Sequence, residues 1–140
     1  MTTEKPKTIS PRTKARQRAL QALYQWHIGK QSLALIESQF FREEDMHAVD
    51  RKFFRRLLQG IPEHSLELDE KIKPKLDRDI AQLDPIEHTI LRMGLYEILL
   101  VDDIPWRVSI NEYIELAKLF GGDQSHKYVN GILDRLHKNT

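Results

Sequence analysis

Apolar residues recur at intervals of three and four along most of this chain, a period typical of amphipathic α-helices rather than of strands. The first such stripe begins after Pro11 and ends near Gly29. Its members are Ala15, Ala19, Ala22, Leu23 and Trp26. Polar residues occupy the opposite face, namely Lys14, Arg18, Gln21 and Gln25. The pattern predicts a first helix that buries one side and exposes a basic, polar side.

Three further helices are predicted in the first half of the chain. One covers 32–41, and another opens at Asp50, whose carboxylate is a good helix cap. Gly60 and Pro62 are expected to close this third helix, because both residues disfavour a helix interior. A fourth helix follows and cannot pass Pro74 without a break or a kink.

The most apolar segment begins with a strong helix-start signature. Asp84 is a capping residue, Pro85 needs no N–H in the first turn, and Glu87 stands where a capping box places its reciprocal carboxylate. We expect this helix to be central to the core and to end near 102–103. Gly94 within it is expected to let a neighbouring helix approach closely.

Two more helices are predicted in the C-terminal third. Ser109 and Glu112 repeat the capping-box spacing, so a helix is expected to open there and to stop at Gly121. A last helix begins near 123–125 and continues through Leu136. With about seven helices and no convincing strand, the sequence predicts an all-α protein.

The domain organisation follows from the absence of any long linker or internal repeat. We expect a flexible basic arm over 1–11 and a single helical domain over 12–140. The chain has no cysteine, which excludes disulfides, thiolate metal sites and cysteine nucleophiles. It also has no apolar run of the ~20 residues that a membrane-spanning helix requires. The expected location is the cytoplasm, with no membrane partner.

Charge is distributed unevenly along the chain. No aspartate or glutamate occurs from Lys5 to Ile36, and residues 1–18 hold six basic and one acidic residue. This gives that segment a formal charge of +5 and leaves −4 for the other residues. Clustered cations bind phosphates and release counterions, which predicts salt-sensitive nucleic-acid binding. The alternative is a solvated, frayed terminus that binds nothing.

No catalytic constellation is recognisable in the sequence. Only Glu44 and His47 have the Glu-x-x-His spacing of a di-metal site, and they fall in an expected loop. His126 would serve as a base only beside a nucleophile that the sequence does not reveal. No glycine-rich phosphate loop is present. The sequence therefore favours a binding module over an enzyme and predicts no cofactor and no metal.

Several segments, in the same order along the chain, resemble the NusB family of bacterial transcription antitermination factors. Three of them fill the C-terminal third, and others lie in the first helix and in the central apolar helix, so the likeness extends over essentially the whole chain. The matching segments are 15–16, 22–26, 91–97, 105–112, 115–121 and 125–131.

The resemblance implies a fold of two packed three-helix bundles and a non-enzymatic, RNA-binding role. Proteins of this family pair with the ribosomal protein NusE, and the heterodimer recognises single-stranded RNA carrying the boxA element of nascent ribosomal RNA. It then joins other Nus factors and RNA polymerase to suppress premature termination. Some members form homodimers that cover the RNA-binding surface, so a homodimer is an open alternative for this chain.

The resemblance also implies a set of binding residues. Cations at the start of the first helix would hold phosphates, an aromatic residue of the last helix would stack on an unpaired base, and a position that is usually acidic in the family carries Gln124 here. The implied RNA-binding residues are Arg12, Lys14, Arg16, Arg18, Gln124, Lys127 and Tyr128. Glu87 is the implied contact for the protein partner.

Other interpretations stay open at this level. Tyr128 would also fit a partly buried helix position, and helix capping alone would explain Glu87. A helical adaptor that binds only proteins would fit the same pattern with an incidental basic terminus. A domain of this type also precedes the catalytic domain of certain ribosomal RNA cytosine methyltransferases, but this chain carries no cofactor loop and no cysteine nucleophile.

Overall fold

The computed structural model describes residues 9–29 and 31–138. This part of the chain contains seven α-helices, two short 3-10 helices and no strand, so the predicted all-α class is confirmed. The α-helices are α1 (Pro11–Ile28), α2 (Leu33–Glu43), α3 (Arg51–Glu63), α4 (Ser65–Ile72), α5 (Pro85–Leu100), α6 (Trp106–Phe120) and α7 (Ser125–Lys138). The 3-10 helices η1 (Lys73–Lys75) and η2 (Ile80–Gln82) lie between α4 and α5.

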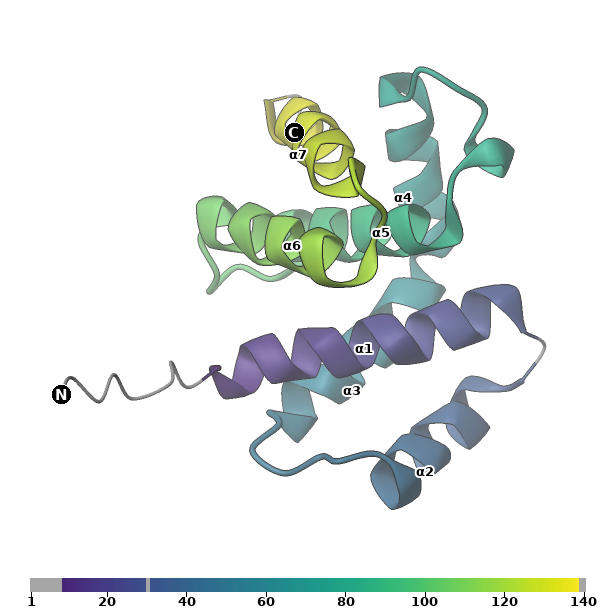
Figure 1. Ribbon diagram of the computed structural model, residues 1–140, viewed down its shortest axis with the longest axis vertical. Coiled ribbons are helices and arrows are strands. Elements are labelled where there is room, and N and C mark those ends of the chain that lie inside the picture. The colour runs from purple at the N-terminus through teal and green to yellow at the C-terminus, as the bar shows by residue number, and fades with distance from the viewer. Residues whose placement is uncertain (1–8, 30, 139–140) are drawn as a thin grey trace, which may run out of the picture.

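The helices form two packed bundles. Helices α1, α2 and α3 pack against one another in the lower half of Figure 1, and α5, α6 and α7 do so in the upper half. Helix α1 joins the two bundles by packing on α5, while α4 packs on α5 and α7. The two three-helix bundles expected from the resemblance are therefore confirmed. The remaining α-helix, α4, lies beside the second bundle.

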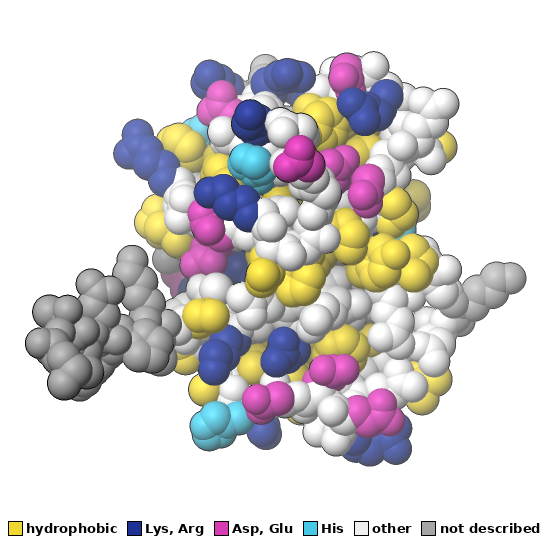
Figure 2. Space-filling model, viewed as in Figure 1, with side chains coloured by type: hydrophobic (Ala, Val, Ile, Leu, Met, Phe, Trp, Pro, Cys, Tyr) yellow, Lys and Arg dark blue, Asp and Glu magenta, His cyan; other side chains and the backbone are white. Residues whose placement is uncertain are grey.

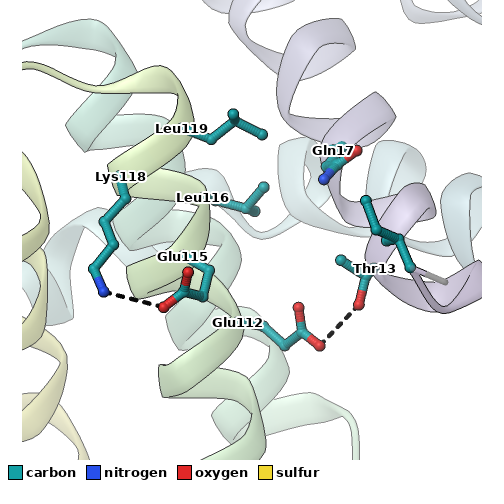
Figure 3. Close-up of a pocket in the computed structure, with 8 residues that line it drawn as sticks. Thr13, Gln17, Glu112, Glu115, Leu116, Lys118 and Leu119 are labelled. Atoms are coloured by element: carbon teal, nitrogen blue, oxygen red, sulfur yellow. Dashed lines mark hydrogen bonds and ion pairs between the residues drawn. The ribbon is translucent and has the colours of Figure 1, made fainter. Parts of the chain in front are cut away.

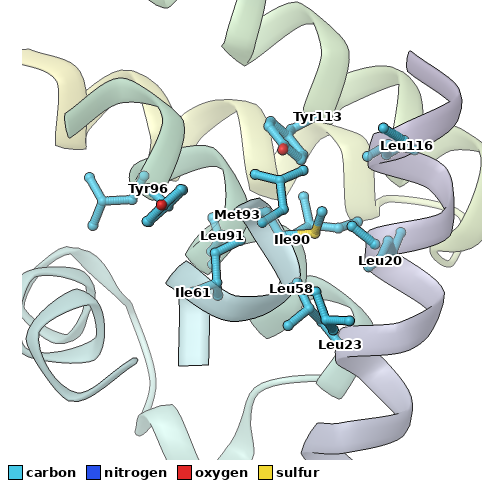
Figure 4. Close-up of a cluster of buried hydrophobic side chains, with 14 of the residues drawn as sticks. Leu20, Leu23, Leu58, Ile61, Ile90, Leu91, Met93, Tyr96, Tyr113 and Leu116 are labelled. Atoms are coloured by element: carbon cyan, nitrogen blue, oxygen red, sulfur yellow. The ribbon is translucent and has the colours of Figure 1, made fainter. Parts of the chain in front are cut away.

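The core is continuous between the bundles and is centred on α5 (Figure 4). Full burial of a large apolar side chain is worth about 1.5–3 kcal/mol, so this shared core holds the two bundles together. Gly94 allows the close approach predicted for it, because a β-carbon there would lie 2.9 Å from Leu133 Cδ2 of α7. Buried contributors from four helices include Leu20, Leu23, Leu58, Ile61, Ile90, Leu91, Met93, Tyr113 and Leu116.

Side-chain caps fix the starts of four helices. Ser10 and Ser32 accept hydrogen bonds from the backbone N–H of Thr13 and Leu35. Asp50 accepts from Phe53 N at 2.9 Å, and Asp84 accepts from Ile86 N at 2.8 Å, which confirms the two predicted capping aspartates. In the described part of the chain, the Glu87 carboxylate does not accept the reciprocal hydrogen bond from the backbone N–H of Asp84.

The predicted end of the third helix is wrong. Helix α3 continues through Gly60 and Pro62 to Glu63, and only His64 separates it from α4. Gly60 is buried against the side chain of Tyr96, and a β-carbon there would lie 2.7 Å from Tyr96 Cζ. Glycine is present at this position to admit a neighbouring side chain and not to end a helix.

The predicted start of the sixth helix is also wrong. Helix α6 begins at Trp106, and Ser109 lies inside it with a fully buried side chain. The Ser109 hydroxyl donates a hydrogen bond to Glu97 Oε1 at 3.1 Å. Glu112 accepts a hydrogen bond from the Thr13 hydroxyl at 2.9 Å. The spacing that looked like a capping box therefore reflects contacts with α5 and α1.

Two other expectations concern the ends of the chain and the membrane. Ser10 caps α1 at Pro11, and residues 1–8 of the expected basic arm lie outside the described residues. Among the residues that the structure describes, none of the helices has the length and apolarity to cross a membrane.

Candidate nucleic-acid interface

Arg12 lies at the exposed start of α1, but carboxylates already surround it. Its Nη2 donates to Asp103 Oδ2 at 3.1 Å, and its Nε lies 3.8 Å from Asp50 Oδ2. The guanidinium carbon also lies 4.8 Å from the centre of the Phe53 ring. About 40% of the Arg12 side chain remains exposed, so a phosphate can reach it in competition with Asp103.

Lys14 and Arg18 are half-exposed cations one turn apart on the same helix. Arg18 Nε donates to the backbone carbonyl of Asp45 at 3.1 Å, which leaves its charge unneutralised by this contact. Lys14 forms no side-chain ion pair within the described ranges. Figure 2 shows basic side chains over the visible face of α1. Both side chains are partly exposed, so a phosphate can reach them.

Arg16 is placed differently from the prediction. Its side chain is buried, with 2% of the residue exposed, and its Nε donates to Glu97 Oε2 of α5 at 2.8 Å. Its Nη2 donates to Glu97 Oε1 at 2.9 Å, and Nη1 lies 3.5 Å from Glu112 Oε1. A guanidinium enclosed in this way does not reach a phosphate in solution. The expectation that Arg16 is a surface cation is corrected, because its partner Glu97 holds it in the core.

Glu97 is the centre of this buried network. It is fully buried and accepts hydrogen bonds from Arg16 of α1 and from Ser109 and Tyr113 of α6. Burial alone would lower the pKa of Arg16, but the hydrogen bonds and charge of Glu97 outweigh it and raise the pKa. Burial and the same carboxylate raise the pKa of Tyr113 well above its ordinary value. The network joins α1 to α5 and α6 and fixes the position of α1 against them.

A groove of about 390 Å³ lies between the start of α1 and α6 (Figure 3). The Thr13 hydroxyl bridges it by donating to Glu112, and Lys118 pairs with Glu115 at 3.2 Å on the α6 side. Leu119 stands at the groove with 62% of its surface exposed. The lining residues are Ile9, Thr13, Gln17, Glu112, Glu115, Leu116, Lys118 and Leu119.

Tyr128 lies on the first turn of α7 between two shallow hollows. Gln124 and Lys127 are exposed beside it, and Tyr128 itself is half-buried. One hollow, of about 340 Å³, is lined by Asp77, Gln124, Lys127, Tyr128, Gly131, Ile132 and Arg135. The other, of about 240 Å³, is lined by Arg78, Glu87, Gly122, Asp123, Gln124, Ser125 and Tyr128. Gln124, which immediately precedes α7, therefore forms one surface with Lys127 and Tyr128 of its first turn.

Two neighbours of Tyr128 were not predicted from the sequence. The Tyr128 hydroxyl donates to Asp77 Oδ1 at 3.2 Å, and the guanidinium carbon of Arg78 lies 4.7 Å from the centre of the Tyr128 ring. Partial burial and the Asp77 carboxylate raise the pKa of Tyr128. Asp77 and Arg78 lie in the turn between η1 and η2, about fifty positions before Tyr128, so no local sequence pattern connects them with it.

The sequence of 13–138 matches the profile of the NusB family along that whole range. The chain belongs to the NusB family. Among curated relatives, the transcription antitermination protein NusB of Pseudomonas entomophila is 47% identical over 94% of this chain and 80% of its own length. That of Pasteurella multocida is 48% identical over 93% of this chain and 90% of its own length.

Solved NusB structures have the same fold. Thermotoga maritima NusB superposes with a TM-score of 0.78 at 32% identity, covering 94% of this chain and 93% of that one. A crystal structure of antitermination factors NusB and NusE in complex with dsRNA gives a TM-score of 0.84 at 23% identity, covering 93% and 98%. At that identity the second match demonstrates the shared NusB fold alone.

The NusB fold separates the predicted RNA-binding residues into two groups. Arg12, Lys14 and Arg18 lie on α1, whereas Gln124, Lys127 and Tyr128 lie at the start of α7. Figure 1 shows α6 between these two places. The α1–α6 groove extends from Thr13 to Leu119, one residue before the end of α6, and so lies between the groups. The structure thus brings the α7 residues together but does not bring them into contact with the α1 cations.

Proposed function

We propose that this chain is a transcription antitermination factor that binds the boxA element of nascent ribosomal RNA as a heterodimer with the ribosomal protein NusE. In this role it joins other Nus factors on RNA polymerase in the cytoplasm and performs no catalysis. The observation that carries the proposal is the family match over 13–138, together with relatives named transcription antitermination protein NusB at 47–49% identity.

The proposed RNA surface has two parts with different chemistry. Lys14, Arg18 and Arg12 on α1 supply positive charge for phosphates, while Tyr128 supplies an aromatic face on which an unpaired base can stack. Lys127 is exposed next to that face. Arg16 is left out of the contact set because it is buried. In this proposal its role is to hold α1 in position through Glu97.

Glu87 is the proposed contact for NusE, and it lies beside the proposed RNA surface. It is half-buried on the first turn of α5 and lines the same hollow as Arg78 and Tyr128. A partner bound at Glu87 would therefore stand next to the proposed base-stacking site. This neighbourhood gives a physical reason for the partner to strengthen RNA binding.

A second candidate function is a helical adaptor that binds only proteins. The exposed Leu119 at the α1–α6 groove favours it, since apolar side chains at a groove are typical of helix docking sites. A homodimer through this groove would belong to the same class. This candidate predicts partner binding without selective RNA binding.

The deciding experiment is fluorescence anisotropy of a labelled boxA RNA and of a scrambled RNA, each titrated with this protein alone and with the NusE-type ribosomal protein. Both titrations are made at two salt concentrations. Selective binding to boxA that NusE strengthens supports the proposal. Equal binding of both RNAs, unchanged by NusE, would leave a non-specific electrostatic patch and favour the adaptor.

A further inference from the structure

Asp77 contacts both of the groups that would meet RNA beside α7. Its Oδ1 accepts a hydrogen bond from Arg78 Nε at 2.9 Å and another from the Tyr128 hydroxyl at 3.2 Å. Its Oδ2 accepts from Arg78 Nη2 at 3.3 Å. The Asp77 carboxylate therefore binds both the guanidinium group of Arg78 and the hydroxyl of Tyr128.

The guanidinium fork of arginine binds carboxylates and phosphates in the same two-point geometry. The Asp77 carboxylate thus stands where an RNA phosphate would bind Arg78. The contact is also reversible, because 64% of the Asp77 side chain and 44% of the Arg78 side chain are exposed, and ion pairs so exposed contribute little to stability. A phosphate of the RNA is able to displace it.

The surroundings of Asp77 are suited to single-stranded RNA. The hollow that Asp77 lines also contains Lys127 and the Tyr128 ring, which offer a cation and a stacking face. Gly131 leaves space at this hollow, since a β-carbon there would have no neighbour within 4 Å. A base and its phosphate therefore have room beside Tyr128.

We propose that Asp77 is an intramolecular mimic of an RNA phosphate, which masks Arg78 and the Tyr128 hydroxyl and lowers the affinity of this surface for RNA. The inference rests on the proposed function and adds Arg78 to the cationic contacts. An RNA that binds Arg78 must first displace Asp77. The mask therefore lowers the affinity of an RNA that contacts only this site. A rival role, in which Asp77 accepts a hydrogen bond from a base amino group, predicts weaker and not tighter RNA binding when Asp77 is replaced by asparagine.

The test is the variant Asp77→Asn, which keeps the shape of the side chain and removes its charge. Anisotropy titrations with boxA RNA and NusE should show about fivefold tighter binding than the wild-type protein. The dependence of log K on log salt should become steeper by about 0.7, the value for one further phosphate contact on a single strand. In an Arg78→Gln background, Asp77→Asn should bring a much smaller gain, because only the Tyr128 hydroxyl remains to be unmasked.

Asp79→Asn is the matched control. Asp79 lies two residues away and caps η2 by accepting from Ala81 N, a contact that asparagine preserves, and it does not bond to Arg78. The Asp79→Asn variant loses one negative charge from the same segment, as Asp77→Asn does. Its affinity for boxA RNA should nevertheless change much less than that of Asp77→Asn. An equal gain from both variants would reduce the effect to general repulsion and overturn the mask.

Other outcomes separate this inference from the proposed function. If the wild-type protein binds boxA selectively and Asp77→Asn binds equally or more weakly, the mask is wrong and the proposed function stands. If the wild-type protein with NusE does not distinguish boxA from scrambled RNA, the proposed function fails, and the inference fails with it.

Discussion

Arg16 shows at the scale of one residue how burial gives a charged side chain a structural role. Replacing it with methionine would leave the Glu97 carboxylate buried without its cation. Breaking a buried ion pair in this way costs about 3–5 kcal/mol. We expect Arg16→Met to lower the free energy of unfolding by about that amount, measured by urea denaturation followed by circular dichroism. Unchanged stability with weaker RNA binding would return Arg16 to the interface.

Position 124 is where an added charge should matter most at the α7 surface. Gln124 is exposed and lines both hollows beside Tyr128. A carboxylate there would repel a neighbouring phosphate by about 1 kcal/mol, so Gln124→Asp should weaken binding to boxA RNA about fivefold at moderate salt. Gln124→Asn is the neutral control. Equal or tighter binding by Gln124→Asp, measured by anisotropy, would remove this position from the RNA surface.

Helices α1, α4 and α5 meet at a cluster of titratable groups. Arg92 donates to His27 Nδ1 at 3.2 Å, and both Arg92 and His88 donate to Asp69. Burial and the charge of Arg92 lower the pKa of His27 from its ordinary 6.5. Burial alone would raise the pKa of Asp69, but its bonds to Arg92 and His88 lower it well below the ordinary 3.8.

These shifts predict how the packing of the three helices responds to acid. Below pH 6.5 the unfolded chain takes up a proton at His27 before the folded chain does, so the free energy of unfolding should fall as pH decreases from 7 to 5. A further loss is expected below 3.8, when Asp69 is protonated in the unfolded state first. Urea titrations across this range measure both steps. His27→Gln should reduce the first step and leave the second; an unchanged slope between pH 7 and 5 would contradict the assignment to His27.

The helices could be predicted from the sequence wherever the deciding contacts are local. Asp50 and Asp84 cap backbone groups two or three positions ahead, and such signals are readable in adjacent residues. Ser109 misled because its partner is Glu97, twelve positions earlier on another helix. Gly60 misled because its small size serves the packing of Tyr96. Tertiary contacts decided both of these positions.

The binding surface shows the same limit. Tyr128 and Lys127 were predicted from the family resemblance; Lys127 is exposed and Tyr128 is half-buried. Arg78 was missed, because only the folded chain brings the turn before α5 against α7. Arg16 was misplaced, because a basic residue in a basic segment gives no local sign of a buried partner 81 positions away.

At the scale of the whole molecule, the proposed RNA surface consists of two separated groups of residues, and the group on α1 holds three cations. Replacing Arg12, Lys14 and Arg18 together with glutamine should weaken binding to boxA RNA and make log K less dependent on log salt by about 2, since each phosphate contact on a single strand contributes about 0.7. Anisotropy titrations over a series of salt concentrations give this slope. NusE binding, measured by calorimetry, should be unchanged.

A control of equal charge makes that experiment specific. Arg42, Lys71 and Lys138 are exposed on α2, α4 and the end of α7. Their replacement with glutamine removes the same net charge from other faces. If both triple variants lost the same affinity, the total charge of the protein and not the α1 surface would determine binding.

The carboxylate of Glu97 has a consequence for how the protein opens. Because groups from α1 and α6 bond to it simultaneously, detaching either helix would deprive a buried carboxylate of part of its hydrogen bonds. Partial opening is therefore disfavoured, and backbone amides of α1 and α6 should exchange with deuterium through the same cooperative event. In the proposed function, the first helix therefore presents its cations from a frame that is already rigid, and RNA binding carries no entropic cost of ordering that helix.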